Sequence, residues 1–90
     1  GNIIFGLTAA LKDPITFKNG AAEQANFDTY RMLRINEAPR SIEVHLVDND
    51  EAPGGVGEPG LPPIAAALMN AVANMTGKRM RELPFDLQSI

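Results

Sequence analysis

The apolar segment at residues 3–12 places the strongest constraint on how this chain can fold. It is apolar almost all round a helix, through Ile3, Ile4, Phe5, Leu7, Ala9, Ala10 and Leu11. A helix of that kind is buried rather than amphipathic. A chain of 90 residues buries only about 60% of the surface that its unfolded form exposes, so it has little partner surface to offer. The segment therefore predicts that surface outside these residues helps to cover it.

Composition excludes several classes of protein. The chain has no cysteine, so neither a disulfide nor a thiolate site for a metal or an iron–sulfur cluster is possible. The net charge of −3 is too mild to indicate binding to nucleic acid or to an anionic membrane surface. The one basic cluster, Lys78, Arg79 and Arg81, is expected to be solvated or to face another subunit. No apolar run approaches the roughly 20 residues of a membrane helix, and no signal peptide is visible. Because Gly1 leads directly into the apolar segment, we interpret the start as a cut end.

The remaining patterns predict an α+β fold with a small antiparallel sheet and two helices. Residues 14–18 and 22–27 are expected to be strands joined by Asn19-Gly20, a favoured pair for a tight hairpin turn. Residues 42–47 alternate apolar and polar side chains, which predicts the third strand.

The second helix is predicted over residues 63–76. Its apolar stripe consists of Ile64, Leu68, Val72 and Met75. Gly77 is placed to end this helix in a left-handed conformation. The only histidine, His45, lies on the polar face of the third predicted strand, where a surface role is expected.

A long loop at residues 48–63 separates the last predicted strand from this helix. Loops of this length in compact domains are usually functional or disordered. Its glycines Gly55, Gly57 and Gly60 have the G-x-G-x-x-G spacing of dinucleotide-binding turns. The loop is too long for the required tight turn, and Glu58 would bring a carboxylate next to the phosphates, which disfavours this interpretation.

Glu58 itself supports a second interpretation of the loop. Glycines on both sides would let the backbone approach a bulky ligand closely, and Pro59 stiffens the chain just after the carboxylate. A glutamate held in this way can act as a general base when a reacting atom comes within hydrogen-bond reach. The residues alone do not distinguish this role from that of a glutamate on a flexible surface loop.

Four ordered segments together resemble one known family. The first is GNIIFGLTAAL at 1–11, and the second is ITFKNG at 15–20 with QANF at 24–27 and YR at 30–31. The third is PGGVGEPG at 53–60, and the fourth runs from PPIA at 62–65 through TGKR at 76–79 to LP at 83–84. This set is similar to the carboxy-terminal end of the molybdenum-binding subunit of the xanthine oxidase/aldehyde oxidase family. It most resembles the branch of isoquinoline 1-oxidoreductase beta subunits and related aldehyde dehydrogenases.

The resemblance implies a role for particular residues. In this family the glutamate of the G-x-G-E-P segment, here Glu58, is the catalytic base beside the molybdenum. It assists the attack of a water-derived oxygen on an electron-poor carbon of an N-heteroaromatic ring or an aldehyde. Gly55 and Gly57 are expected to let the loop approach the cofactor. Many relatives carry a glutamine near the metal where Phe5 stands, and Phe5 is expected to pack in a core.

The resemblance also implies what surrounds these residues. The cofactor would be molybdopterin carrying molybdenum, in the cytosine dinucleotide form common in bacteria. The partners would be an iron–sulfur small subunit and the upstream part of the same subunit. Residues 1–90 would then be the carboxy-terminal piece of a larger molybdopterin-binding domain, and are expected to be inactive and free of cofactor when isolated. The alternative is a stand-alone small protein-interaction domain derived from this family.

Overall fold

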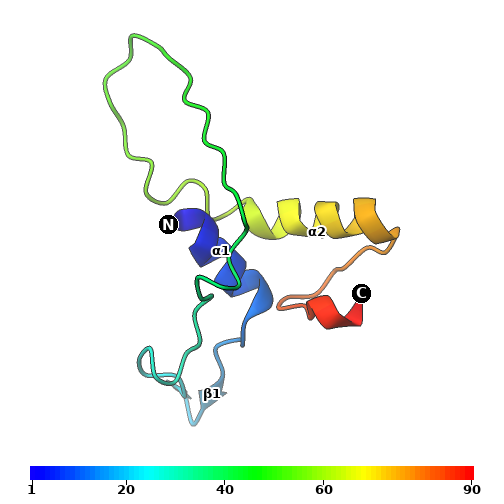
Figure 1. The fold of residues 1–90 in the computed structure, drawn as a ribbon. Coiled ribbons are helices and arrows are strands. Elements are labelled where there is room, and N and C mark those ends of the chain that lie inside the picture. The colour runs from blue at the N-terminus through cyan, green and yellow to red at the C-terminus, as the bar shows by residue number, and fades with distance from the viewer.

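The computed structural model describes residues 1–90, which form two helices, one short hairpin and a terminal 3-10 turn. The elements are α1 (Asn2–Leu11), β1 (Phe17–Lys18), β2 (Ala21–Ala22), α2 (Ile64–Thr76) and η1 (Leu87–Ser89). The two helices lie against each other, the hairpin lies beyond the end of α1, and a long irregular segment projects away from the helices (Figure 1). The predicted α+β class with two helices and an antiparallel pair is therefore confirmed.

The helices meet at a glycine. A Cβ atom built on Gly6 of α1 would lie 2.8 Å from Cβ of Ile64, the first residue of α2, so only a glycine permits this approach. The buried side chains come from both helices and from two irregular segments: Thr8, Ala10, Val72, Leu33 and Phe85. The main-chain N–H of Phe85 donates to the carbonyl of Ala10 at 3.0 Å, which fixes the C-terminal segment beside α1.

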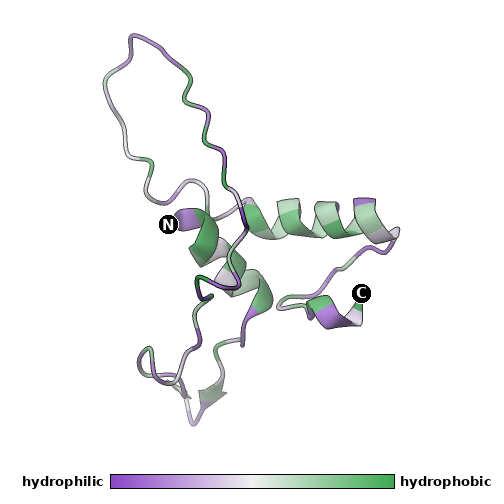
Figure 2. Cartoon of the chain, viewed as in Figure 1, coloured by the Kyte–Doolittle hydropathy of each residue, from purple (hydrophilic) through white to green (hydrophobic).

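Helix α2 agrees with its prediction to within one residue. It ends at Gly77, whose φ of 76° is left-handed as expected and whose N–H donates to the carbonyl of Ala73. The predicted apolar stripe is only partly correct: Val72 is buried, but Met75 is 75% exposed. Figure 2 shows hydrophobic residues along most of α2, and the exposure of Met75 shows that the chain covers only part of them.

The hairpin is confirmed but is shorter than predicted. Asn19 and Gly20 both have positive φ, and Phe17 pairs with Ala22 in antiparallel register. The return strand ends at Ala22 rather than continuing to residue 27. The side-chain oxygen of Gln24 accepts from the main-chain N–H of Thr16 at 2.9 Å, in the place of a main-chain carbonyl, and the chain then turns.

The third predicted strand is wrong for this chain. Residues 42–47 are exposed, belong to no sheet, and none of their main-chain N–H groups donates a hydrogen bond. They form the outgoing side of a projecting loop, residues 38–57, which we call the arm (Figure 1). Alternation specifies which side chains share a face, but a strand forms only where a neighbouring strand accepts its main-chain hydrogen bonds.

Helix α1 is covered on two sides but not all round. Gly6 and Ala10 share one side, Thr8 lies on nearly the opposite side, and Phe5, which lies between them, is 56% exposed. Core packing of Phe5 is therefore wrong for these residues, because no segment of the chain covers this side of α1.

Candidate functional site

Glu58 lies where the arm returns to the helices. Its carbonyl accepts a hydrogen bond from the N–H of Leu61 at 2.9 Å, which closes a turn over Pro59 and Gly60. The side chain of Glu58 is exposed and makes no hydrogen bond or ion pair within the chain. The turn thus holds the backbone in place and leaves the carboxylate free for a group from outside.

Asn2, at the start of α1, holds this turn on both sides of Glu58. Its side-chain amide donates to the carbonyl of Val56 at 3.1 Å. On the other side, a Cβ atom built on Gly60 would lie 2.5 Å from Oδ1 of Asn2, so Gly60 is the residue that leaves room for the amide. One side chain at the N-terminal end of α1 therefore positions the two segments that flank the glutamate.

A hollow of about 410 Å³ opens beside the carboxylate. It is lined by Gly1, Asn2, Phe5, Gly57, Glu58 and Leu61. The exposed ring of Phe5 and the side chain of Leu61 give apolar walls next to a single carboxylate. Such a site can accommodate a flat apolar molecule and accept a proton from a group bound against it.

Gly57 lines this hollow, and Gly55 lies two residues earlier on the arm. A Cβ atom built on either glycine meets nothing within 4 Å, and neither N–H donates to another main-chain group. Nothing within the chain therefore requires glycine at these two positions. The dinucleotide-binding interpretation of the loop lacks its strand, since residues 42–47 form none, and Pro62 and Pro63 precede α2 without N–H donors.

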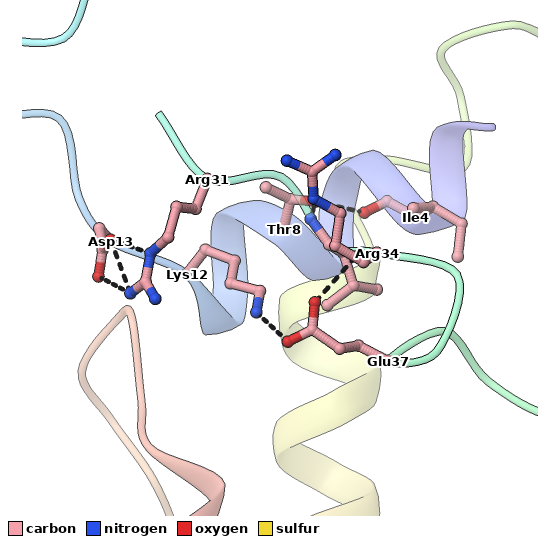
Figure 3. A network of polar contacts seen from close by, with 8 residues as sticks. Ile4, Thr8, Lys12, Asp13, Arg31, Arg34 and Glu37 are labelled. Carbon is pink, nitrogen blue, oxygen red and sulfur yellow. Dashed lines mark hydrogen bonds and ion pairs between the residues drawn. The ribbon is translucent and has the colours of Figure 1, made fainter. Parts of the chain in front are cut away.

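Other polar groups are structural or exposed. Arg31 donates two hydrogen bonds of 2.9 Å to Asp13, and Lys12 pairs with Glu37, so residues 31–37 are fixed to the end of α1 (Figure 3). The hydrogen bond from Arg31 lowers the pKa of the Asp13 carboxyl, and that from Lys12 lowers the pKa of Glu37. The two ion pairs hold the segment that contains Leu33. Leu33 lies in the core, and its main-chain N–H donates to Oγ1 of Thr8 at 3.1 Å.

His45 is a surface residue, as predicted: its ring is 86% exposed and lies 3.6 Å from Glu43. Lys78, Arg79 and Arg81 are also exposed. The structure contains no group of three or more His, Cys, Asp or Glu side chains that could hold a metal ion. No helix has the length and apolar character needed to cross a membrane. The candidate site is therefore the single carboxylate of Glu58 with its apolar walls.

Comparisons with known proteins give a consistent set of relatives. The chain is 43% identical over 84 residues to the beta subunit of isoquinoline 1-oxidoreductase of Brevundimonas diminuta, covering 93% of this chain and 11% of that subunit. It is 33% identical to a protein of Gluconacetobacter polyoxogenes that is named a membrane-bound aldehyde dehydrogenase (pyrroloquinoline-quinone). This match again covers 93% of this chain and 11% of the relative. It is 31% identical to the molybdenum-binding subunit of an aldehyde oxidoreductase of Escherichia coli, covering 100% of this chain and 13% of the relative.

The chain is homologous to part of a molybdenum-binding subunit of the xanthine oxidase family. It spans only about a tenth of the length of the curated relatives that it matches. No protein-family profile matches the chain, and no solved structure matches it. The homologues are oxidoreductase subunits, and the designation of a beta subunit implies further subunits in that complex.

Sequence reasoning found Glu58 from its motif but missed Asn2, Gly60 and Leu61. The contact between Asn2 and Val56 spans 54 positions, and no local periodicity carries that information. The shared ordered segments at residues 1–11 and 53–60 are the signal that could have linked them, since both belong to the resemblance.

Proposed function

We propose that this chain is the part of a molybdenum-dependent hydroxylase that supplies the general base, Glu58, to the substrate site. The full subunit would oxidise N-heteroaromatic compounds or aldehydes with water as the source of oxygen. The observation that carries this proposal is the free carboxylate of Glu58 at the edge of an apolar hollow, on a turn held by Asn2. The names of the homologues, which include an isoquinoline oxidoreductase and two aldehyde-oxidising enzymes, support the same class of reaction.

The residues around Glu58 fit a bulky cofactor that is held mainly by other parts of a subunit. Gly55 and Gly57 leave open space where side chains would otherwise project, and their N–H groups are free to donate to such a group. We propose that these two glycines let the arm approach molybdopterin, in its cytosine dinucleotide form. The cofactor, when bound, would supply the two-electron oxidation of the substrate.

The chemical role of Glu58 follows from the balance of the reaction. Hydroxylation of a C–H bond by water releases two protons and two electrons. One of these protons leaves the water oxygen as that oxygen bonds to the substrate carbon, and the Glu58 carboxylate would accept it. Phe5 and Leu61 would hold a flat substrate against the carboxylate and exclude water from the apolar side.

The remaining partners belong to the same proposal. We infer that the rest of the subunit holds most of the cofactor, because the 84 matched residues cover only 11% of two of the relatives. The isolated chain would therefore be inactive. An iron–sulfur small subunit would take the electrons that leave the cofactor. One relative is named for pyrroloquinoline quinone and not for molybdenum, so the metal content of the full-length subunit should be measured.

A second candidate is a stand-alone protein-interaction domain that derives from this family. It is favoured by the many large apolar side chains that the chain leaves exposed, including Phe17, Phe27, Ile35 and Leu46. In that case Glu58 would have no chemical role.

Replacement of Glu58 by glutamine in the full-length subunit tests the main proposal. The amide keeps the shape of the side chain but cannot accept the proton, so kcat should fall by about 10² to 10⁴. The molybdenum content should stay unchanged. Glu51→Gln is the matched control, since Glu51 is another exposed glutamate on the arm and should keep its rate. A Glu58→Gln enzyme with full turnover would remove Glu58 from the mechanism.

A further inference from the structure

The outgoing side of the arm has unpaired main-chain groups. Residues 42–47 are exposed and irregular, follow a stretched path in Figure 1, and their main-chain N–H groups have no acceptor. His45 Nε2 lies 3.6 Å from Glu43 Oε2. If the segment formed a strand, the alternate residues Ile42, Val44 and Leu46, which are 45%, 72% and 86% exposed, would share the opposite face. An apolar face combined with free main-chain donors is the arrangement that pairs with another strand.

The arm is held at its two ends rather than loose. Before the arm, the N–H of Leu33 donates to Thr8 on α1. Near its other end, Val56 accepts from Asn2, also on α1. Figure 1 shows the arm leaving and returning on the same side of the helices. A partner strand would therefore meet a segment whose two ends are already held by α1.

The exposed area indicates how large the missing partner is. The chain exposes 7536 Å², whereas a compact protein of 9.7 kDa would expose about 5,100 Å². The excess of about 2,400 Å² on one partner exceeds a standard protein–protein contact and matches an obligate, core-like interface. Because the matched relatives are about nine times as long as this chain, the rest of the same subunit is the occupant that fits this area.

We propose that residues 42–47 form a β-strand that pairs with a strand from the rest of the same subunit and buries the face of Ile42, Val44 and Leu46. Pairing with one neighbouring strand would satisfy alternate main-chain N–H groups and keep Glu43 and His45 on the uncovered side. The strand leads through residues 48–57 to Glu58, so its docking would also fix the outer end of the arm. This inference rests on the homology with longer subunits and is independent of whether Glu58 is the base.

Hydrogen exchange on the full-length subunit, without an iron–sulfur partner, tests the pairing. The alternate main-chain amides of residues 42–47 that donate to the partner strand should exchange about a hundredfold more slowly than in the isolated 90-residue chain. Amides that exchange equally fast in both would overturn the proposal. Protection that depends on protein concentration would assign the strand to a second copy, and protection seen only with the iron–sulfur subunit would assign it to that partner. Either result would also overturn it.

A pair of conservative cysteine variants tests which face is covered. The chain has no cysteine of its own, so Val44→Cys and His45→Cys each add one thiol, at neighbouring positions on opposite faces. In the isolated chain both should react with a maleimide at similar rates, because both positions are exposed. In the full-length subunit Val44→Cys should become at least tenfold slower, while His45→Cys stays reactive. Equal reactivity of the two thiols in the subunit would reject the proposed face, whatever the turnover of the Glu58 variant.

Discussion

The contact between Gly6 and Ile64 sets the distance between α1 and α2. Replacement of Gly6 by alanine would place Cβ 2.8 Å from Cβ of Ile64 and 3.1 Å from the carbonyl oxygen of Leu61. Alanine normally stabilises a helix interior by about 1 kcal/mol relative to glycine. Here the clash involves a branch point and main chain, so the helices must separate, at a cost of about 1–3 kcal/mol.

We therefore expect Gly6→Ala to lower the urea midpoint of the chain, followed by circular dichroism. Gly54→Ala is the control, because a Cβ atom there meets nothing within 4 Å, and its midpoint should be nearly unchanged. A higher midpoint for Gly6→Ala would show that helix propensity outweighs the contact and that the helices are not packed at this glycine.

Asn2 and Gly60 act together through one contact that positions the turn of Glu58. Asn2→Ala removes the hydrogen bond to Val56, and Gly60→Ala displaces the same amide. Loss of one such hydrogen bond, worth about 0.5–1.5 kcal/mol, should lower the kcat of the full-length subunit severalfold. The double variant should be no worse than either single variant, since both remove the same contact.

Steady-state kinetics of the three variants measures this coupling. Asn49→Ala is a suitable control, because the amide of Asn49 contacts only its own neighbours, Val47 and Glu51. Its rate should equal that of the unchanged subunit. Effects of Asn2→Ala and Gly60→Ala that multiply in the double variant would show that the two residues act separately.

Among elements, the segment of residues 31–37 is tied to α1 by contacts that depend on pH. The pKa values of Asp13 and Glu37 are lowered by hydrogen bonds from Arg31 and Lys12 respectively. A carboxyl whose folded pKa lies below its unfolded value stabilises the fold above the unfolded pKa. That contribution is lost as the pH falls through the folded pKa. The segment should thus stay attached at neutral pH and detach below about pH 4, the usual range of free carboxyls.

A titration of the amide resonances of residues 31–37 by NMR measures this release. Their shifts should change together below about pH 4. In Asp13→Asn, the part of the shift change that comes from Asp13 should disappear. The free energy of unfolding should fall only slightly, because the Asp13–Arg31 pair is exposed. Resonances that do not change below about pH 4 would contradict this assignment.

Elements that depend on local signals were predicted, and elements that depend on distant partners were not. The α2 helix and its Gly77 end, and the Asn19-Gly20 turn, follow from residues within one turn of each other. The strand predicted at residues 42–47 from its alternation does not form, because no strand within the chain pairs with it. Phe5, expected in a core, and Met75, expected on the apolar stripe of α2, are exposed because no segment of the chain covers them. Within the site, the motif identified Glu58, whereas the role of Asn2 depends on a contact across 54 positions.

At the scale of the whole molecule, the chain is too extended for its length. Its radius of gyration is 15.8 Å, compared with about 12 Å for a compact chain of this size. Only 6 of the 90 residues are buried, so the small core around α1 cannot draw the arm inward. The arm also resists collapse, because Asp48, Asp50 and Glu51 are charged and the residues that follow are rich in proline and glycine.

Small-angle X-ray scattering of the isolated chain should therefore give a radius of gyration near 16 Å or larger, rather than about 12 Å. Replacing residues 41–52 by a short Gly-Ser linker should lower this radius, because the arm contributes most of the extension in Figure 1. Deletion of the same length from the C-terminal tail is the control and should lower it less. A radius of about 12 Å for the intact chain would mean that the arm folds back onto its own helices. The face of Ile42, Val44 and Leu46 would then need no partner from the rest of a subunit.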